Sequence, residues 1–350
     1  MPPFTVVLII PTGVGAAIGG YAGDALPIAK AIAKVSDRLI THPNVLNGAQ
    51  LYWPLENTYY VEGYGLDRFA TNQWGLKPVR QNKVGSLLDQ AIEPELRLRH
   101  VQAADATRAT LGLNLTDYVV TDAPLEVELR TADSGASWGT IKNSGSLLRA
   151  ADKLINQGGA EAIAVVARFP DDDQSTALQE YRQGQGVDHL AGAEAVISHL
   201  IVRHFQVPAA HAPALQPLAV DEMVNPRAAA EELGYTFLPC VLVGLSRAPQ
   251  FMTNRQSANP ETIWAESVDV VIVPYSTCGG SAILNFSHSK TEIIAVTNNT
   301  TQIQVPPEPL GVKVTPVSSY LEALGTLVTR QVGMDERVFY PNLSSLKCLF

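Results

Sequence analysis

Continuous apolar runs alternate with helical patterns along this chain of 350 residues, and this alternation constrains the fold more than any other feature. A strand buried on both faces of a parallel sheet reads as an unbroken apolar run, whereas a strand with one solvated face alternates. The expected strands are residues 6–10, 162–167, 239–245, 268–273 and 292–296. The sequence therefore predicts an α/β fold with mostly parallel or mixed sheets flanked by helices.

The order of the expected elements suggests two lobes. Helical patterns cover residues 26–35, 147–155, 191–205, 226–233 and 318–328. Residues 59–61 and 125–129 instead combine aromatic or alternating residues, which is typical of antiparallel strands. We expect an N-terminal α/β lobe, residues 1–135, with an antiparallel-rich insertion, and a C-terminal α/β lobe, residues 136–350. One continuous domain is the alternative.

Composition limits the partners and the location of the protein. The formal net charge is −9 and 46% of the residues are hydrophobic, so we expect a compact globular protein that binds neither nucleic acid nor an anionic membrane. No apolar run approaches the roughly 18 residues that span a bilayer. The three cysteines form no metal-binding pattern, and the first residues lack the charge pattern of a secretory leader. We therefore expect a cytoplasmic protein.

A glycine-rich loop follows the first expected strand and contains Gly13, Gly15 and Gly19. Such strand-to-helix turns expose backbone N–H groups that bind anions. The loop matches dinucleotide-binding patterns only in part, and the Tyr-x-x-x-Lys pair of short-chain dehydrogenases is absent. A nucleotide, a smaller phosphate or carboxylate, and a turn that needs glycine for packing remain the alternatives. No cofactor is assigned.

A second strand-to-helix turn contains Cys278, Gly279, Gly280 and Ser281. A thiol at a helix start has a lowered pKa and is a candidate nucleophile, and the flanking N–H groups could bind an oxyanion. The alternative is that Cys278 is a small buried hydrophobe. Cys240 lies inside an apolar run and is interpreted as structural.

Two histidines are candidates for acid–base chemistry. His42 follows an expected strand near residue 39, and His211 lies between prolines at an expected strand end or loop. Open α/β sheets bind ligands at such strand ends. His199 and His204 are five residues apart, which does not suit two metal ligands on one helix face. We therefore predict no metal site.

Three further polar residues occupy expected strand ends. Arg168 and Arg247 could each hold a carboxylate or phosphate, and Asn298 follows the strand at residues 292–296. Together with the glycine loops, these residues form the expected ligand-binding set.

Several segments together resemble one family, Domain of Unknown Function 3326. These are residues 10–20 (IPTGVGAAIGG), 41–48 (THPNVLNG), 181–187 (YRQGQGV), 244–249 (GLSRAP) and 278–281 (CGGS). The resemblance covers nearly the whole chain but implies no reaction. Residues 147–168 also resemble one unit of the ring-opening cyclic amide hydrolases, although Arg168 replaces the lysine of that family and three repeated units are not evident.

These observations favour an enzyme that acts on a small anionic or polar metabolite in a cleft of glycine-rich loops, with a cysteine or an acid–base residue. A non-catalytic sensor or carrier of a nucleotide or metabolite is the first alternative. The others are a ring-opening amidohydrolase-like enzyme and a homo-oligomeric structural protein whose glycines only serve packing.

Overall fold

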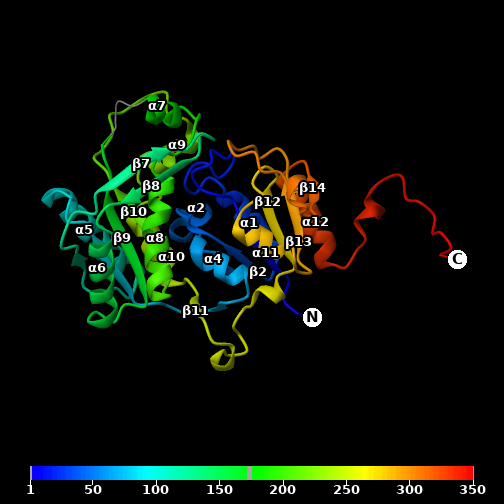
Figure 1. Cartoon of the computed structure of the whole chain (residues 1–350), viewed down its shortest axis with the longest axis horizontal. Coiled ribbons are helices and arrows are strands. Elements are labelled where there is room, and N and C mark those ends of the chain that lie inside the picture. Colours follow the sequence, from blue (N-terminus) through cyan, green and yellow to red (C-terminus); the bar gives the residue numbers. More distant parts are fainter. Residues whose placement is uncertain (1, 172–175, 350) are drawn as a thin grey trace.

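The computed structural model describes residues 2–171 and 176–349, and it is built on two parallel sheets with helices on both faces of each (Figure 1). The predicted α/β class is therefore confirmed. In the view of Figure 1, β9 and β10 lie in the left part of the molecule and β12 and β13 in the right part.

The larger sheet has six strands in the order β14-β13-β12-β1-β2-β3, and every neighbouring pair is parallel. Its strands are β1 (Thr5–Leu8), β2 (Arg38–Thr41), β3 (Thr58–Tyr60), β12 (Val270–Pro274), β13 (Glu292–Val296) and β14 (Thr315–Val317). The strand order runs one way from β1 to β3 and the other way from β12 to β14. The direction of winding thus changes between β1 and β12, where open α/β sheets place their ligand sites.

Alternation along the strands explains how this sheet packs. Val6 and Leu8 of β1 belong to the core on one face, which contains α1 (Leu26–Lys34) and α12 (Tyr320–Gln331), while Val7 belongs to the core on the other. That second face packs against α4 (Gly63–Ala70) and α11 (Ser281–Phe286). Both faces are covered, so the strands read as unbroken apolar runs.

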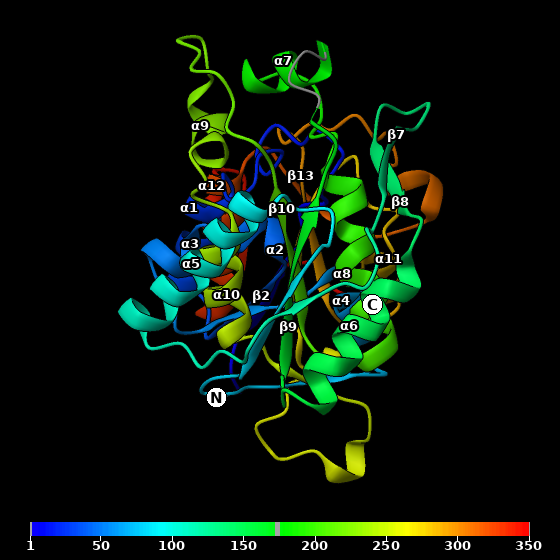
Figure 2. The ribbon, with the colours of Figure 1, turned by 90° about the vertical axis from the view of Figure 1, so that its left-hand side faces the viewer.

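The smaller sheet has the order β10-β9-β5-β6 and is also parallel. Its strands are β5 (Val84–Leu88), β6 (Val119–Val120), β9 (Ala162–Arg168) and β10 (Ala209–Ala214). Figure 2 shows α5 (Pro94–Leu111) and α10 (Leu238–Ser246) on one side of β9, and α6 (Ser144–Asn156) and α8 (Ala191–Phe205) on the other. Helix α8 also contacts α4, which links the two layered units.

The remaining elements are short. Two antiparallel pairs join β4 (Gly75–Lys77) to β11 (Gln250–Met252), and β7 (Val127–Thr131) to β8 (Ser137–Ile141). The short helices are α2 (Pro43–Leu46), α3 (Ala49–Tyr52), α7 (Thr176–Arg182) and α9 (Pro226–Glu232), with 3-10 turns at Arg255–Ser257, Ala265–Ser267, Glu308–Leu310 and Glu336–Phe339.

Two secondary-structure predictions are wrong. Residues 239–245 form helix α10 rather than a strand, because α10 packs on β9 and β10 and also contacts α3 and α5, so apolar residues surround it. A short run that is apolar throughout cannot distinguish a strand from a buried helix. Residues 59–61 overlap β3, which pairs in parallel with β2 rather than antiparallel. The antiparallel prediction at residues 125–129 is confirmed by β7.

A division near residue 135 does not separate the two sheets. Each sheet takes strands from both sides of that position, since β1 pairs with β12 and β5 pairs with β9. The hairpin of β7 and β8 spans the expected boundary itself. The two layered units are therefore each assembled from distant parts of the chain.

Candidate functional site

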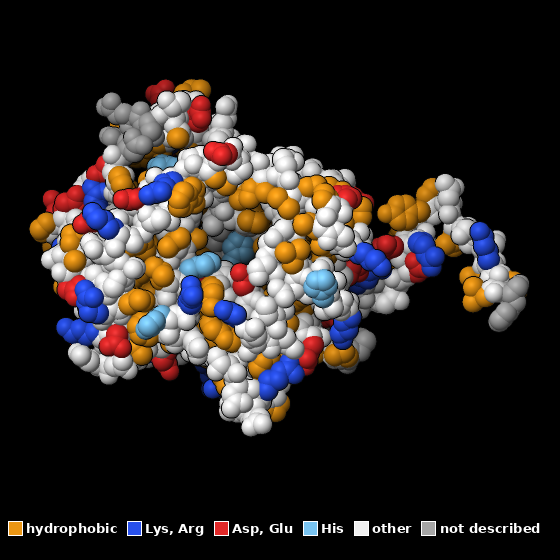
Figure 3. Space-filling view, viewed as in Figure 1, with side chains coloured by type: hydrophobic (Ala, Val, Ile, Leu, Met, Phe, Trp, Pro, Cys, Tyr) orange, Lys and Arg blue, Asp and Glu red, His pale blue; other side chains and the backbone are white. Residues whose placement is uncertain are grey.

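A cavity of about 290 Å³ lies at the carboxyl ends of the central strands of the larger sheet. Its wall includes residues that directly follow β1, β2, β3 and the loop after β12, and α8 and β10 of the smaller unit close it. In Figure 3 the face that includes this region is hollowed near its middle, where histidine side chains are visible.

Both glycine-containing loops reach this cavity, but the glycines of the first loop do not line it. Pro11 and Thr12 come from the first loop, and Gly280 and Ser281 come from the second. A Cβ at Gly13 would lie 2.6 Å from the Ser137 Oγ, and its φ of +69° disfavours other residues. Gly15 and Gly19 also have positive φ and pack closely against Val187 and Ile10. These three glycines therefore serve chain packing in this structure.

The two glycines of the second loop also differ in their surroundings. A Cβ at Gly279 would lie 2.7 Å from Val305, whereas Gly280 has open space around it. Cys278 is fully buried, its Sγ lies 3.5 Å from the Tyr275 carbonyl oxygen, and burial raises the pKa of the thiol to about 11. A buried thiol with a raised pKa has the properties of a structural cysteine rather than of a nucleophile.

His42 lies in the cavity wall, directly after β2 as the sequence predicted. Its Nε2 accepts a hydrogen bond from the Ile10 N–H at 3.0 Å, and burial lowers the pKa of the ring to about 4. The neutral ring must therefore carry its proton on Nδ1. No residue in the described parts of the chain is recorded as a hydrogen-bond partner of Nδ1, so His42 presents one free donor.

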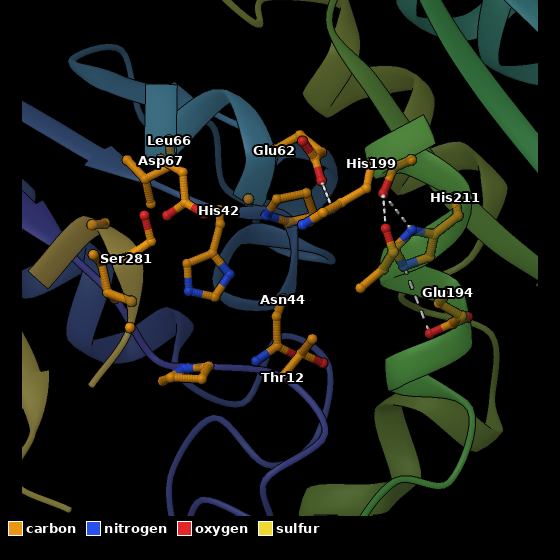
Figure 4. A pocket seen from close by; sticks show the side chains of 18 of the residues that line it. Thr12, His42, Asn44, Glu62, Leu66, Asp67, Glu194, His199, His211 and Ser281 are labelled. Carbon is orange, nitrogen blue, oxygen red and sulfur yellow. Dashed lines mark hydrogen bonds and ion pairs between the residues drawn. The ribbon is translucent and has the colours of Figure 1, made fainter. Parts of the chain in front are cut away.

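A carboxylate–imidazole pair faces the cavity beside His42. The Glu62 side chain caps α4 by accepting from the Tyr64 N–H at 2.8 Å and from the Gly65 N–H at 3.3 Å. Its other oxygen contacts Nδ1 of His199, which projects from α8 (Figure 4). Burial alone would lower the pKa of His199, but the Glu62 carboxylate, together with Asp67 and the Ala195 backbone, outweighs burial and the pKa is raised.

Asp67 lies on the same wall, one turn further along α4. Its carboxylate lies close to the Ala282 N–H at the start of α11, and this N–H favours the ionised carboxylate. Burial raises the pKa of Asp67, and the nearby His199 ring opposes that shift. The His199 ring therefore lies within the field of two carboxylates, Glu62 and Asp67.

His211 lies in the middle of β10 rather than at a strand end or in a loop, so that expectation is wrong. Its Nδ1 is 3.2 Å from the Ser198 Oγ, and its Nε2 is 3.6 Å from Glu194. Burial, together with the charge of His199, lowers the pKa of His211 to about 3, while burial raises the pKa of Glu194 well above its usual range. His211 is thus a neutral residue at the back of the cavity.

Three of the predicted ligand-binding residues lie elsewhere. Arg168 ends β9 as expected, but its guanidinium is held by Glu93 and Asp171. Arg247 is exposed at the end of helix α10, not at a strand end, and Asn298 is exposed after β13. None of the three is among the residues that line the cavity.

Comparison with known proteins identifies the family. A family model described as "Protein of unknown function (DUF3326)" matches residues 5–339. The chain belongs to the DUF3326 family. It is 62% identical over 337 residues to an uncharacterised lipoprotein of Synechococcus sp.. The aligned region covers 96% of this chain and 93% of that relative. No solved structure matches the chain.

Membership of the DUF3326 family confirms the resemblance drawn from the sequence motifs. In the ranges 2–171 and 176–349, no helix is long and apolar enough to cross a bilayer. In the same ranges, no group of three or more His, Cys, Asp and Glu side chains is arranged to hold a metal ion.

Sequence reasoning missed three residues of this DUF3326 chain that the cavity brings together. Glu62 and Asp67 gave no pattern, and His199 was considered only as a metal ligand. One weak signal was available for Glu62, because carboxylates are favoured near the start of a helix. Nothing in the sequence shows that His199 of α8 lies beside it.

Proposed function

We propose that this protein is an enzyme that acts on a small polar metabolite by acid–base chemistry, with His199 as the proton-transferring residue. The contact between Glu62 and His199 carries the proposal. A carboxylate on Nδ1 fixes the ring orientation and tautomer and leaves Nε2 for the substrate, as in carboxylate–histidine pairs of many enzymes. Because α4 holds the Glu62 carboxylate through two backbone N–H groups, the pair is rigid.

The other cavity residues suit defined roles in such a reaction. The Nδ1–H of His42 is a fixed neutral donor for an oxygen or nitrogen of the substrate. Glu62 is a positioning residue that acts through His199. The raised pKa of His199 favours the protonated ring, so its Nε2 can donate a proton to the substrate.

The test compares the native protein with His199→Asn and Glu62→Gln. Each is incubated with a small-molecule extract, and mass spectrometry follows which compounds are consumed and formed. We expect the native protein to convert at least one compound, His199→Asn to lose that conversion, and Glu62→Gln to lower its rate and shift its pH profile. Conversion that persists in a folded His199→Asn protein would contradict the role of His199. A compound that binds without conversion would favour the sensor or carrier.

The proposed location is the cytoplasm, as expected from the cysteine content. The name of the Synechococcus relative, an uncharacterised lipoprotein, favours a membrane-attached location as the alternative. Fractionation of cells into soluble and membrane parts, followed by detection of the native protein, distinguishes the two. Recovery with the membranes after a high-salt wash would overturn the cytoplasmic assignment.

A further inference from the structure

The wall of the cavity carries several acidic groups and no basic side chain other than histidine. Among the described residues that line it are Glu62, Asp67, Asp188 and Glu194, and none of these lining residues is an arginine or lysine. Glu62 contacts His199, and the same ring also acts on Asp67. The sequence-based preference for an anionic ligand therefore has little support in this wall, because its one favoured cation, His199, already faces the Glu62 carboxylate.

Glu194 has the least compensation of these groups. Its side chain is 13% exposed, and its nearest polar contact in the described chain is the His211 Nε2 at 3.6 Å, beyond hydrogen-bond distance. The groups that act on it are Asp188 from the loop before α8, Glu231 from α9 and the neutral His211 from β10. A buried carboxyl without a counter-charge is costly to ionise, and this is why its pKa is raised well above normal.

Asp188 lines the same side of the cavity, and it favours the same class of ligand as Glu194. Its Oδ1 accepts from the Leu190 N–H at 2.9 Å, which orients the carboxyl at the start of α8. Burial raises the pKa of Asp188 as well. A cation placed between Asp188 and Glu194 would stabilise both ionised carboxylates, whereas an anion would be repelled.

The free donor of His42 gives an independent requirement. His42 is 9% exposed, and its Nδ1–H lines the cavity without a recorded partner among the described residues. A donor that faces the cavity without a protein partner can bind an acceptor of a ligand, so a bound molecule should bring one to it. Apolar side chains of Ile9, Leu66 and Ile283 line the space as well and suit an aliphatic linker.

We propose that the cavity binds a small organic cation, an amine whose aliphatic chain also carries a hydrogen-bond acceptor. The amine lies against Glu194 and Asp188, and the acceptor takes the proton of His42. This inference rests on the proposed function, because it names the ligand class of the same cavity. The volume of about 290 Å³ accommodates a molecule of this kind, since a water molecule takes about 30 Å³ in the liquid.

Three probes of nearly equal shape test the ligand class. Aminobutanol, butanediol and hydroxybutanoate share a four-carbon chain and a hydroxyl and differ in charge. Their affinities for the full chain are measured by calorimetric titration at neutral pH and matched ionic strength. We expect aminobutanol to bind roughly tenfold more tightly than butanediol, and hydroxybutanoate to bind most weakly. Equal affinities, or tighter binding of the anion, would overturn the proposal.

Two variants test whether the preference for aminobutanol arises in the cavity. Glu194→Gln keeps the shape of the side chain and removes its charge, so it should abolish most of the preference for aminobutanol and leave butanediol binding unchanged. Asp105→Asn removes an exposed carboxylate outside the cavity wall and should leave the preference intact. A preference that survives in Glu194→Gln would contradict this placement.

The binding measurement is independent of turnover. His199→Asn should retain the preference for aminobutanol even where it abolishes conversion. Retained preference with no conversion by the native protein would contradict only the proposed enzyme function. Conversion of a neutral or anionic compound, with no amine preference, would contradict only this inference.

Discussion

The carboxylate of Asp67 lies close to the backbone N–H of Ala282, where α4 packs against α11 at the wall of the cavity. The same carboxylate raises the pKa of His199. One side chain therefore connects the position of the second glycine-containing loop with the protonation of the proposed acid–base residue.

Replacing Asp67 by Asn should lower the pKa of His199, because a negative charge near the imidazolium is removed. The amide keeps the size of the side chain and an oxygen near the Ala282 N–H, so we expect a loss of stability of no more than about 1 kcal/mol. NMR titration of the His199 ring measures the pKa, with Asp105→Asn as the control. An unchanged His199 pKa would show that Asp67 does not act on this ring.

Replacing Glu62 by Gln should lower the pKa of His199 more than Asp67→Asn does, because Glu62 has the larger effect on this ring. It should also destabilise the protein by about 1–3 kcal/mol, because a buried helix cap and an ion pair are weakened. The His199 pKa is raised in the folded state, so its contribution is complete below the unfolded value of about 6.5 and fades as pH rises through the folded value. Urea unfolding should therefore show a larger native-to-variant difference at mildly acidic than at alkaline pH. A difference that grows with pH would be inconsistent with this pair.

Acid should destabilise the protein through buried histidines with lowered pKa, which include His42, His211 and His100. The pKa is lowered to about 4 for His42 and to about 3 for His211, so the unfolded chain binds more protons than the folded chain below about pH 6.5. Unfolding free energy should fall by a few kcal/mol as pH drops from about 6.5 to about 4. His211→Gln should flatten this dependence in urea titrations, and an equally steep slope would exclude His211 as a cause.

Replacing Gly13 by Ala should destabilise the protein by about 1–3 kcal/mol, because the residue has a φ of +69° and its new Cβ would meet Ser137. Gly325→Ala in α12 is the matched control. Nothing lies within 4 Å of its new Cβ, and alanine favours a helix over glycine by about 1 kcal/mol. Thermal unfolding should move in opposite directions for the two variants.

Alkylation should label Cys348 much faster than Cys278. Cys348 is exposed, whereas Cys278 is buried and its pKa is raised to about 11. Mass spectrometry after short exposure to iodoacetamide measures both labelling rates. In a separate binding measurement, Cys278→Ser should keep the ligand affinity of the native protein. Faster labelling of Cys278 would restore it as a candidate nucleophile.

Much of the fold could be predicted because strands and helices here follow local patterns. The strand at residues 292–296 and the helix at residues 191–205 have the predicted bounds. The error at residues 239–245 arose because α10 is surrounded by protein. All faces of the helix are therefore apolar, and the sequence shows no helical periodicity there. The pairing of β1 with β12 also could not be read, since no local pattern specifies partners so distant in sequence.

The site was harder to predict than the fold. His42 was found because its place directly after a strand is a local feature, and the loops around Thr12 and Gly280 were found through their glycines. Glu62 and His199 form a pair only because α4 and α8, from different parts of the chain, pack together. The acidic residues could be listed from the sequence, but their gathering on one wall of the cavity depends on tertiary packing.

The central place of β1 also has a consequence for biosynthesis. This strand is synthesised long before one of its two neighbours, β12, which is made only after residue 269. Until then β1 presents an open edge of unpaired backbone groups, which invites association with other nascent chains. A chain cut short before β12 should therefore accumulate as aggregate, and it would lack the part of the cavity wall formed by Thr277 and residues 280–283.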